Sequence, residues 1–144
     1  NKAYYSIVEP VCSNLGVSLQ TATPDTPVSR DKMGDFYSKN HVLICTSAHE
    51  GGPMPIVEAL ASARPVITTN VGIVPEMVEN GYNGLIIERS RSALKKAIET
   101  MIEHPNILEE MHQNLFKNEF NRYTESMLDS YYTMFESLEP NGDE

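Results

Sequence analysis

The sequence is short of cysteine, of positive charge and of long apolar runs. Its 144 residues include two cysteines, and 11 Lys and Arg stand against 20 Asp and Glu, for a formal net charge of −9. This balance argues against a nucleic-acid-binding protein, because affinity for a phosphate backbone depends mostly on clustered Lys and Arg. No apolar run approaches the roughly 20 residues of a transmembrane helix, so we predict no membrane-spanning segment.

The two cysteines, Cys12 and Cys45, are expected to be free thiols. Neither has a Cys or His neighbour at the spacing of metal ligands, so we expect no bound metal. Cys45 lies in the apolar run 42–45, where a thiol packs as a small hydrophobic group. Free thiols are typical of a reducing compartment, and we therefore expect a cytoplasmic protein.

Along most of the chain, segments whose apolar residues have helical spacing alternate with segments whose apolar residues have strand spacing. Helical spacing and helix-start signals predict helices over residues 2–14, 29–39, 54–63, 75–79, 90–103, 105–120 and 124–138. Short β-rich or apolar runs predict strands over residues 17–21, 42–46, 65–69 and 84–87. The alternation predicts an α/β fold, with a Rossmann-like parallel sheet, right-handed crossovers and flanking helices.

Single residues mark several predicted boundaries. Gly16 is expected to end the first helix, and Ser29 and Ser90 are expected to cap the helices that follow them. Pro105 suits the first position of a helix. The unbroken apolar run 42–46 predicts a strand that is buried on both faces.

The segment after residues 42–46 is the richest candidate site, because ligands of open parallel sheets bind beyond the carboxyl ends of strands. It reads Ser47-Ala48-His49-Glu50-Gly51-Gly52-Pro53-Met54-Pro55-Ile56-Val57-Glu58. Gly51 and Gly52 let the backbone approach a ligand closely, and the two prolines favour a helix start. Free N–H groups at the positive end of that helix suit a phosphate.

Two carboxylates flank this predicted phosphate site. At roughly 100° per residue, Glu58 lies about 160° from the apolar stripe of its helix, so we expect it to face away from the core. Glu50 precedes the glycines and is expected to face the same ligand. Because carboxylates accept hydrogen bonds from hydroxyls, the pair favours a phosphate ester that carries hydroxyls, such as a nucleotide sugar. The alternative is that Glu50 caps the helix and Glu58 is a solvated surface residue.

The stretch from Glu50 to Ala59 resembles the E-x7-E signature of the family 4, or group 1, glycosyltransferases, which are retaining enzymes of the GT-B fold. Two later segments are also similar to that family. They are the strand and glycine turn over residues 63–72 and the segment Pro75-Glu76-Met77-Val78-Glu79-Asn80-Gly81-Tyr82-Asn83-Gly84-Leu85. Ile73 stands where the family often has a second glycine, so we expect a stiffer loop after Thr69.

The resemblance implies roles for the matching residues. Glu50 would be the catalytic residue, contacting the donor sugar and stabilising charge in the transition state. The segment of Gly51, Gly52, Pro53 and Met54 would bring backbone N–H groups to the donor pyrophosphate. Glu58 would accept hydrogen bonds from the ribose, and Thr23 would lie near the nucleobase. The donor would be a UDP- or GDP-sugar, used as substrate, and the resemblance implies no cofactor.

The resemblance covers the latter part of a donor-binding domain. We therefore interpret residues 1–139 as a glycosyltransferase C-terminal domain truncated at its N-terminus, and residues 140–144 as a flexible tail. The N-terminal acceptor domain, and any peripheral membrane contact, would belong to the missing part of the protein. The isolated chain is expected to be inactive. A non-catalytic scaffold module and a sugar-nucleotide epimerase of the same fold remain alternatives.

Two further expectations concern a strand edge and a helix face that would lose their neighbours in a truncated domain. The predicted strand 17–21 is expected to pair directly with residues 42–46. The alternatives are pairing to a second chain, and intervening strands that belong to the protein but are lacking from this chain. On the last predicted helix, Met127, Tyr131, Met134 and Leu138 form one stripe. That stripe would be exposed or would contact a second copy of the chain, giving a homodimer. The alternative is that it packs on its own sheet.

Overall fold

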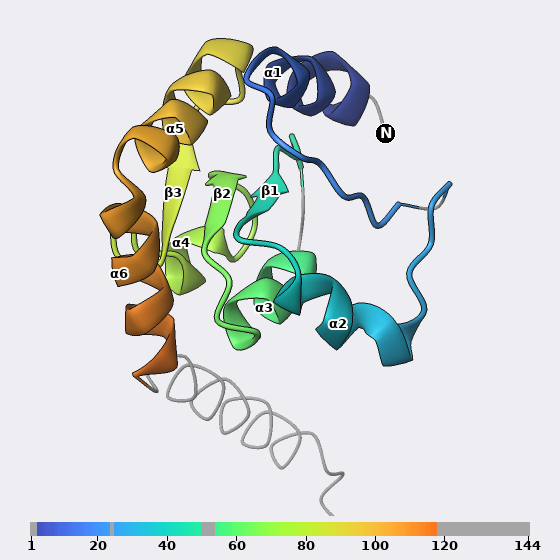
Figure 1. The fold of residues 1–144 in the computed structure, drawn as a ribbon, viewed down its shortest axis with the longest axis vertical. Helices are drawn as coiled ribbons and strands as arrows, with labels where there is room; N and C mark the ends of the chain where they lie inside the picture. The colour runs from blue at the N-terminus through green and yellow to red at the C-terminus, as the bar shows by residue number, and fades with distance from the viewer. Residues whose placement is uncertain (1–2, 24, 50–53, 118–144) are drawn as a thin grey trace, which may run out of the picture.

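The computed structural model describes residues 3–23, 25–49 and 54–117, in which helices and short strands alternate (Figure 1). A π-helical turn, η1 (Tyr4–Val8), continues as α1 (Glu9–Asn14), and a 3₁₀ turn, η2 (Arg30–Lys32), continues as α2 (Met33–Ser38). The remaining elements are β1 (Leu43–Cys45), α3 (Met54–Ala61), β2 (Val66–Thr69), α4 (Val74–Met77), β3 (Gly84–Ile87), α5 (Arg91–Glu103) and α6 (Pro105–Phe116).

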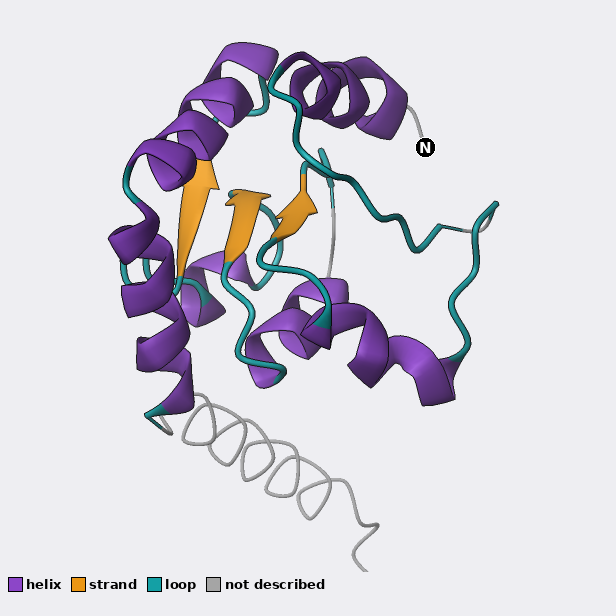
Figure 2. Ribbon diagram, viewed as in Figure 1, coloured by secondary structure: helices purple, strands orange, loops and turns teal. Residues whose placement is uncertain are grey.

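The three strands form one parallel sheet in which β2 lies between β1 and β3 (Figure 2). Ile67 of β2 is in register with Ile44 on one side and with Leu85 on the other. The predicted α/β fold with a parallel sheet is confirmed. The prediction that residues 42–46 are buried on both faces is wrong, since every residue of β1 is only half-buried. Within the described residues β1 pairs with β2 alone, so it is an edge strand.

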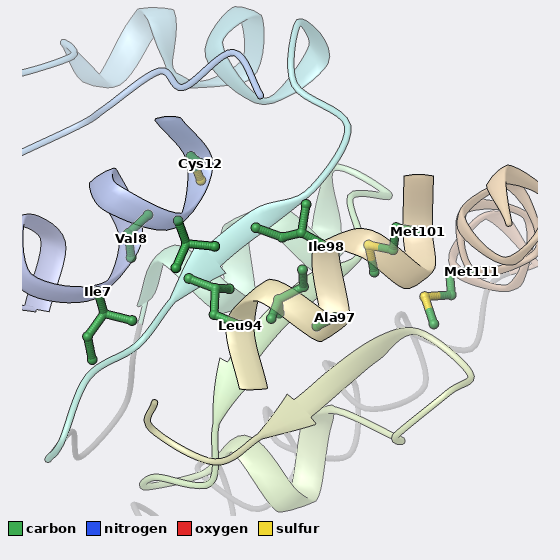
Figure 3. Close-up of a cluster of buried hydrophobic side chains, with 10 residues drawn as sticks. Ile7, Val8, Cys12, Leu94, Ala97, Ile98, Met101 and Met111 are labelled. Atoms are coloured by element: carbon green, nitrogen blue, oxygen red, sulfur yellow. The ribbon is translucent and has the colours of Figure 1, made fainter. Parts of the chain in front are cut away.

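Helices cover both faces of the sheet, and the side chains of β2 alternate between two hydrophobic clusters. Ile67 packs with the first cluster, drawn in Figure 3, and Val66 packs with the second. The buried residues of the first cluster are Ile7, Val8, Val11, Cys12, Ile67, Leu94, Ala97, Ile98, Met101 and Met111. Those of the second are Tyr37, Ile56, Ala59, Leu60, Ala63, Val66, Val74, Val78 and Leu115. The second cluster therefore joins α2, α3 and α4.

Residues 17–21 form an extended stretch and not the predicted strand. Val17 and Leu19 are half-buried against the first cluster, whereas Ser18 and Gln20 are exposed. The Val17 N–H donates to the Cys12 carbonyl at 2.9 Å, and the Asn40 side-chain amide donates to Gln20 Oε1 at 3.1 Å. Among the described residues it forms no ladder with β1, so the predicted direct pairing is wrong. Alternating apolar residues bury one side of a segment, but a strand also needs a neighbour in hydrogen-bonding register.

Most of the predicted helix boundaries are confirmed. Gly16 has a φ of 65° after α1, the Ser90 hydroxyl accepts a hydrogen bond from the Ala93 N–H at 3.1 Å, and Pro105 opens α6. The Ser29 side chain makes no capping bond. The reason is local, because the Lys32 N–H that it would accept from is bonded to the Ser29 carbonyl at 2.9 Å.

Several predictions fall on residues outside the described part of the chain. These are the helix over 124–138 with its apolar stripe and the tail over 140–144. None of the helices in the described ranges is long and apolar enough to span a membrane.

Candidate functional site

The described part of the candidate site lies on α3 and on the segments that pack beside it. Glu50, Gly51, Gly52 and Pro53 lie outside the described residues, so their roles stay predictions. Met54 is the first residue of α3 and its side chain is exposed, and its role also stays a prediction.

Glu58 lies in the middle of α3, where its carboxylate is half-buried and held by a tyrosine. The Tyr37 hydroxyl donates to Glu58 Oε2 at 3.0 Å, and it also lies 3.3 Å from the Pro55 carbonyl oxygen. Ile56 and Leu60, on the apolar stripe of the same helix, are fully buried. Glu58 is less buried than that stripe, but its carboxylate contacts Tyr37 of the same hydrophobic cluster, so it is not the freely solvated residue of the alternative interpretation.

Tyr37 reaches Glu58 from α2, and its side chain is only 4% exposed. Burial, followed by the hydrogen bond and the charge of Glu58, raises the pKa of the Tyr37 hydroxyl. The hydroxyl therefore keeps its proton near neutral pH and acts as the donor. A hydrogen bond to a carboxylate is stronger than one between neutral groups, so the proton is directed to Glu58 in preference to Pro55.

Arg64 fastens the end of α2 to the turn that follows α3. Its Nε donates to the Tyr37 carbonyl at 2.9 Å and its Nη2 donates to the Ser38 carbonyl at 3.2 Å. Carbonyls in the last turn of a helix have no donors within the helix, and a cation there complements the helix dipole. Tyr37 is therefore held through its backbone as well as through its hydroxyl.

His112 of α6 supports the same turn. Its Nδ1 lies 2.6 Å from the Ala63 carbonyl, and Ala63 has a φ of 53°. Arg64 Nη1 also approaches His112 Nδ1, at 3.4 Å. Since a carbonyl only accepts, Nδ1 must carry the proton and donate it to Ala63, and the guanidinium is then a close neighbour without a hydrogen bond.

Side chains also tie together the carboxyl ends of the strands, where the loop that contains Glu50 begins. The Thr69 hydroxyl donates to the Ser47 carbonyl at 2.6 Å, and Arg89 Nε donates to the Thr46 carbonyl at 3.0 Å. Arg89 follows β3, so it bridges from the far strand of the sheet to the end of β1. These bonds fix the start of the candidate phosphate loop.

Thr23 lies in a small turn that its own side chain helps to close. Its backbone pairs with that of Thr26, and the two hydroxyls are 2.9 Å apart. The Thr26 hydroxyl is also 2.9 Å from that of Thr21. None of the described contacts joins this turn to Glu58, so the placement of Thr23 beside a nucleobase stays a prediction.

The asparagines of the segment over residues 75–85 have a structural explanation. Asn83 is buried; its Oδ1 accepts from the Glu79 N–H at 2.9 Å, and its Nδ2 donates to the Met77 carbonyl at 3.0 Å. Asn80 Oδ1 accepts from the Ile86 N–H at 2.8 Å. Both side chains replace backbone partners in the turn between α4 and β3 and are used by the fold.

The two glycines of the same segment are also required by the backbone. Gly81 has a φ of 87°, which residues with a side chain rarely adopt. A Cβ on Gly84 would lie 2.6 Å from the Val66 carbonyl oxygen, because β3 approaches β2 closely at this point. The two glycines are therefore required by the turn and by the close approach of the two strands.

No group of three His, Cys, Asp or Glu residues within the described ranges is placed to hold a metal ion. The two cysteines, Cys12 and Cys45, are free. The expectation that the reaction needs no metal stays a prediction, since the residues over 50–53 lie outside the described part.

The family model for group 1 glycosyl transferases matches residues 26–119 of the chain. The chain belongs to this family. It is 36% identical over 87 residues to an uncharacterised glycosyltransferase from Methanocaldococcus jannaschii, a match that covers 60% of this chain and 25% of that protein. The chain thus spans about a quarter of that curated relative's length.

Two solved structures of glycosyltransferases are similar. The C-terminal domain of a group 1 family protein, LpcC from Francisella tularensis, superposes with a TM-score of 0.60 at 22% identity, covering 81% of this chain and 60% of that one. HepE from Anabaena, in complex with UDP, superposes with a TM-score of 0.54 at 25% identity, covering 66% of this chain and 29% of that one. The predicted family and the Rossmann-like fold are confirmed.

Proposed function

We propose that this chain is the donor-binding part of a retaining glycosyltransferase, which transfers a sugar from a nucleoside diphosphate to an acceptor. The observation that carries the proposal is the Glu58 carboxylate, half-buried and held in place by Tyr37 within the segment that matches the family. The UDP bound to the similar HepE structure supports a nucleotide ligand.

Different residues of the site bind the ribose, the pyrophosphate and the sugar of the donor. Glu58 accepts hydrogen bonds from the ribose hydroxyls, and Oε1, which accepts none from any described residue, is free for this task. Backbone N–H groups of Gly51, Gly52 and Met54 bind the pyrophosphate at the positive end of α3. Glu50 faces the donor sugar and stabilises the positive charge that develops at its anomeric carbon.

The whole protein also needs an acceptor-binding domain, which we place outside this chain because the chain spans only 25% of a curated relative. The chain by itself is then expected to bind the donor without transferring sugar. Free Cys12 and Cys45 support a cytoplasmic protein. Peripheral membrane contact and a homodimer stay predictions for the whole protein.

Calorimetric titration of the full-length protein with UDP and with GDP tests the binding step. We expect one of the two to bind, and Glu58→Gln to weaken it by about tenfold or more, because the site loses bonds to a charged acceptor. The matched control is Glu103→Gln at the exposed end of α5, which should leave the affinity unchanged. The proposal would be contradicted if neither UDP nor GDP binds, or if Glu58→Gln binds the nucleotide with unchanged affinity.

A turnover assay separates the enzyme from a scaffold that only kept the fold. Glu50→Gln in the full-length protein should abolish most sugar transfer while nucleotide binding remains. A protein that binds the nucleotide but transfers sugar from neither UDP- nor GDP-sugars to any acceptor would favour the non-catalytic module.

A further inference from the structure

Tyr37 has no role in the proposed binding of the donor, yet it is the described residue that holds Glu58. We propose that Tyr37 is a positioning residue, whose hydroxyl orients the Glu58 carboxylate so that it can accept hydrogen bonds from the donor ribose. This inference rests on the proposed function of Glu58 and adds a second residue, from a different helix, to the recognition of the ribose.

The first argument comes from the cost of burying a hydroxyl. Tyr37 belongs to the second hydrophobic cluster and is 4% exposed, so a phenylalanine would fill the same space without a polar atom. A buried hydroxyl is unfavourable unless it forms a hydrogen bond. Both acceptors within reach of the Tyr37 hydroxyl, Glu58 Oε2 at 3.0 Å and the Pro55 carbonyl at 3.3 Å, belong to α3. The hydroxyl is therefore directed at α3.

The second argument concerns the freedom of the glutamate side chain. A glutamate turns about three single bonds, and a ligand that has to order a freely moving carboxylate loses affinity. The bond to Tyr37 orders Glu58 before any ligand arrives. It uses one oxygen, Oε2, and leaves Oε1 without a partner among the described residues. The carboxylate is thus fixed at one oxygen and open at the other.

The third argument is that Tyr37 is itself held firmly. Arg64 donates to the carbonyls of Tyr37 and Ser38 at 2.9 and 3.2 Å, which fixes the end of α2 beside α3. A positioning group has to be more rigid than the group that it orients. The raised pKa of the Tyr37 hydroxyl keeps it a hydrogen-bond donor near neutral pH.

The test compares nucleotides with and without ribose hydroxyls in Tyr37→Phe. The probe is whichever of UDP and GDP the full-length protein binds, together with its 2′,3′-dideoxy analogue. The quantity measured is the ratio of the two dissociation constants within each variant. A partial loss of folding changes both constants equally and leaves this ratio unaltered. Tyr5→Phe, at an exposed tyrosine in η1, is the matched control for removal of a phenolic hydroxyl.

We expect the wild-type protein and Tyr5→Phe to prefer the hydroxylated nucleotide by about tenfold or more. Tyr37→Phe should reduce this preference by at least about threefold while binding of the dideoxy analogue changes little. In a Glu58→Gln background, Tyr37→Phe should have no further effect on the ratio.

One result would overturn the inference alone: an unchanged ratio in Tyr37→Phe, which includes an equal loss of affinity for both nucleotides and indicates a purely structural role. A wild-type protein that binds neither nucleotide, or does not discriminate against the dideoxy analogue, would overturn the proposed function and this inference with it.

Discussion

The turn before β3 and the contact between α2 and α3 both place polar side chains in protected positions, but they satisfy them differently. In the turn, Asn83 uses both its donor and its acceptor on backbone groups of the same turn. At the α2–α3 contact, the Glu58 carboxylate accepts one hydrogen bond at Oε2 and none at Oε1 from the described residues. The side-chain amide of Asn83 thus has hydrogen-bond partners within its own turn, whereas the Glu58 carboxylate can still accept hydrogen bonds from a ligand.

This difference distinguishes motif residues that stabilise the fold from motif residues that are available to bind a ligand. Both regions belong to segments that match the family model, and the match alone does not say which residues act on a substrate. A polar group whose partners are all backbone groups of its own turn stabilises the fold. A carboxylate with spare acceptor capacity is available for hydroxyl groups.

The largest expected effect is on catalysis, from Glu58→Ala in the full-length protein. We expect kcat/KM to fall by about 100-fold, which corresponds to about 2.7 kcal/mol of lost transition-state stabilisation. The thermal stability should change little, because the Tyr37 hydroxyl keeps the Pro55 carbonyl as an acceptor. Steady-state kinetics and a melting curve of the same sample test both parts. A large loss of stability with normal kinetics would make Glu58 a structural residue like Asn83.

The next effect should be on stability alone, from Gly84→Ala. The added Cβ would lie 2.6 Å from the Val66 carbonyl oxygen and has to displace the backbone. We expect a loss of about 2 kcal/mol in the free energy of unfolding, as in other overpacked cores. The control is Gly34→Ala in α2, where nothing lies within 4 Å of the new Cβ and alanine favours the helix. Denaturant unfolding that finds equal stability in the two variants would contradict the close approach of β3 to β2.

Asn83→Ala should have a slightly smaller effect on stability, of about 1 to 2 kcal/mol. The substitution leaves the Glu79 N–H and the Met77 carbonyl without partners in a protected turn. Nucleotide affinity of the folded protein should be unchanged, in contrast to Glu58. Asn106→Ala, at an exposed position in α6, is the matched control. A binding defect in Asn83→Ala without a loss of stability would show that the turn takes part in ligand recognition.

The sequence predicts the alternation of elements well, because helix and strand signals are local. Gly16, Ser90 and Pro105 mark boundaries through their own backbone or side-chain chemistry, and the structure confirms all three. The stretch over 17–21 shows the limit of such signals. Its alternating burial was predictable from the sequence, but the absence of a pairing strand depends on residues far away in the chain.

For the candidate site, the sequence identifies Glu58 through its motif but does not reveal its partner. Tyr37 lies 21 residues away from Glu58, on another helix, and an aromatic residue in an amphipathic helix is usually part of the core. Arg64 lies 27 residues away from Tyr37 in the sequence, and His112 lies 49 residues away from Ala63. These contacts arise from the packing of α2, α3 and α6, which no local pattern in the sequence specifies.

The smallest expected effect is a pH dependence from His112, whose bond to Ala63 supports the turn after α3. Burial lowers the pKa of His112 below its ordinary value of 6.5, the bond to the Ala63 carbonyl opposes this shift, and the Arg64 charge adds to it. The unfolded chain therefore binds more protons in the range just below pH 6.5, and stability falls as the pH drops through that range.

Unfolding free energies at pH 7.5 and pH 5.5 test this assignment. We expect the wild-type protein to lose more stability between the two pH values than His112→Gln, which has no titratable group at that position. Equal losses in the two proteins would show that His112 is not the source of the pH dependence.

The central claim is that Glu58, held by Tyr37, accepts hydrogen bonds from the ribose of a nucleotide donor. A crystal structure of the full-length protein with bound UDP or GDP tests it most directly. We predict that a Glu58 carboxylate oxygen lies within about 2.5–3.0 Å of a ribose hydroxyl oxygen, with the Tyr37 hydroxyl still bonded to the other oxygen. A nucleotide whose ribose lies away from α3, or a Glu58 side chain turned away from both groups, would contradict the account.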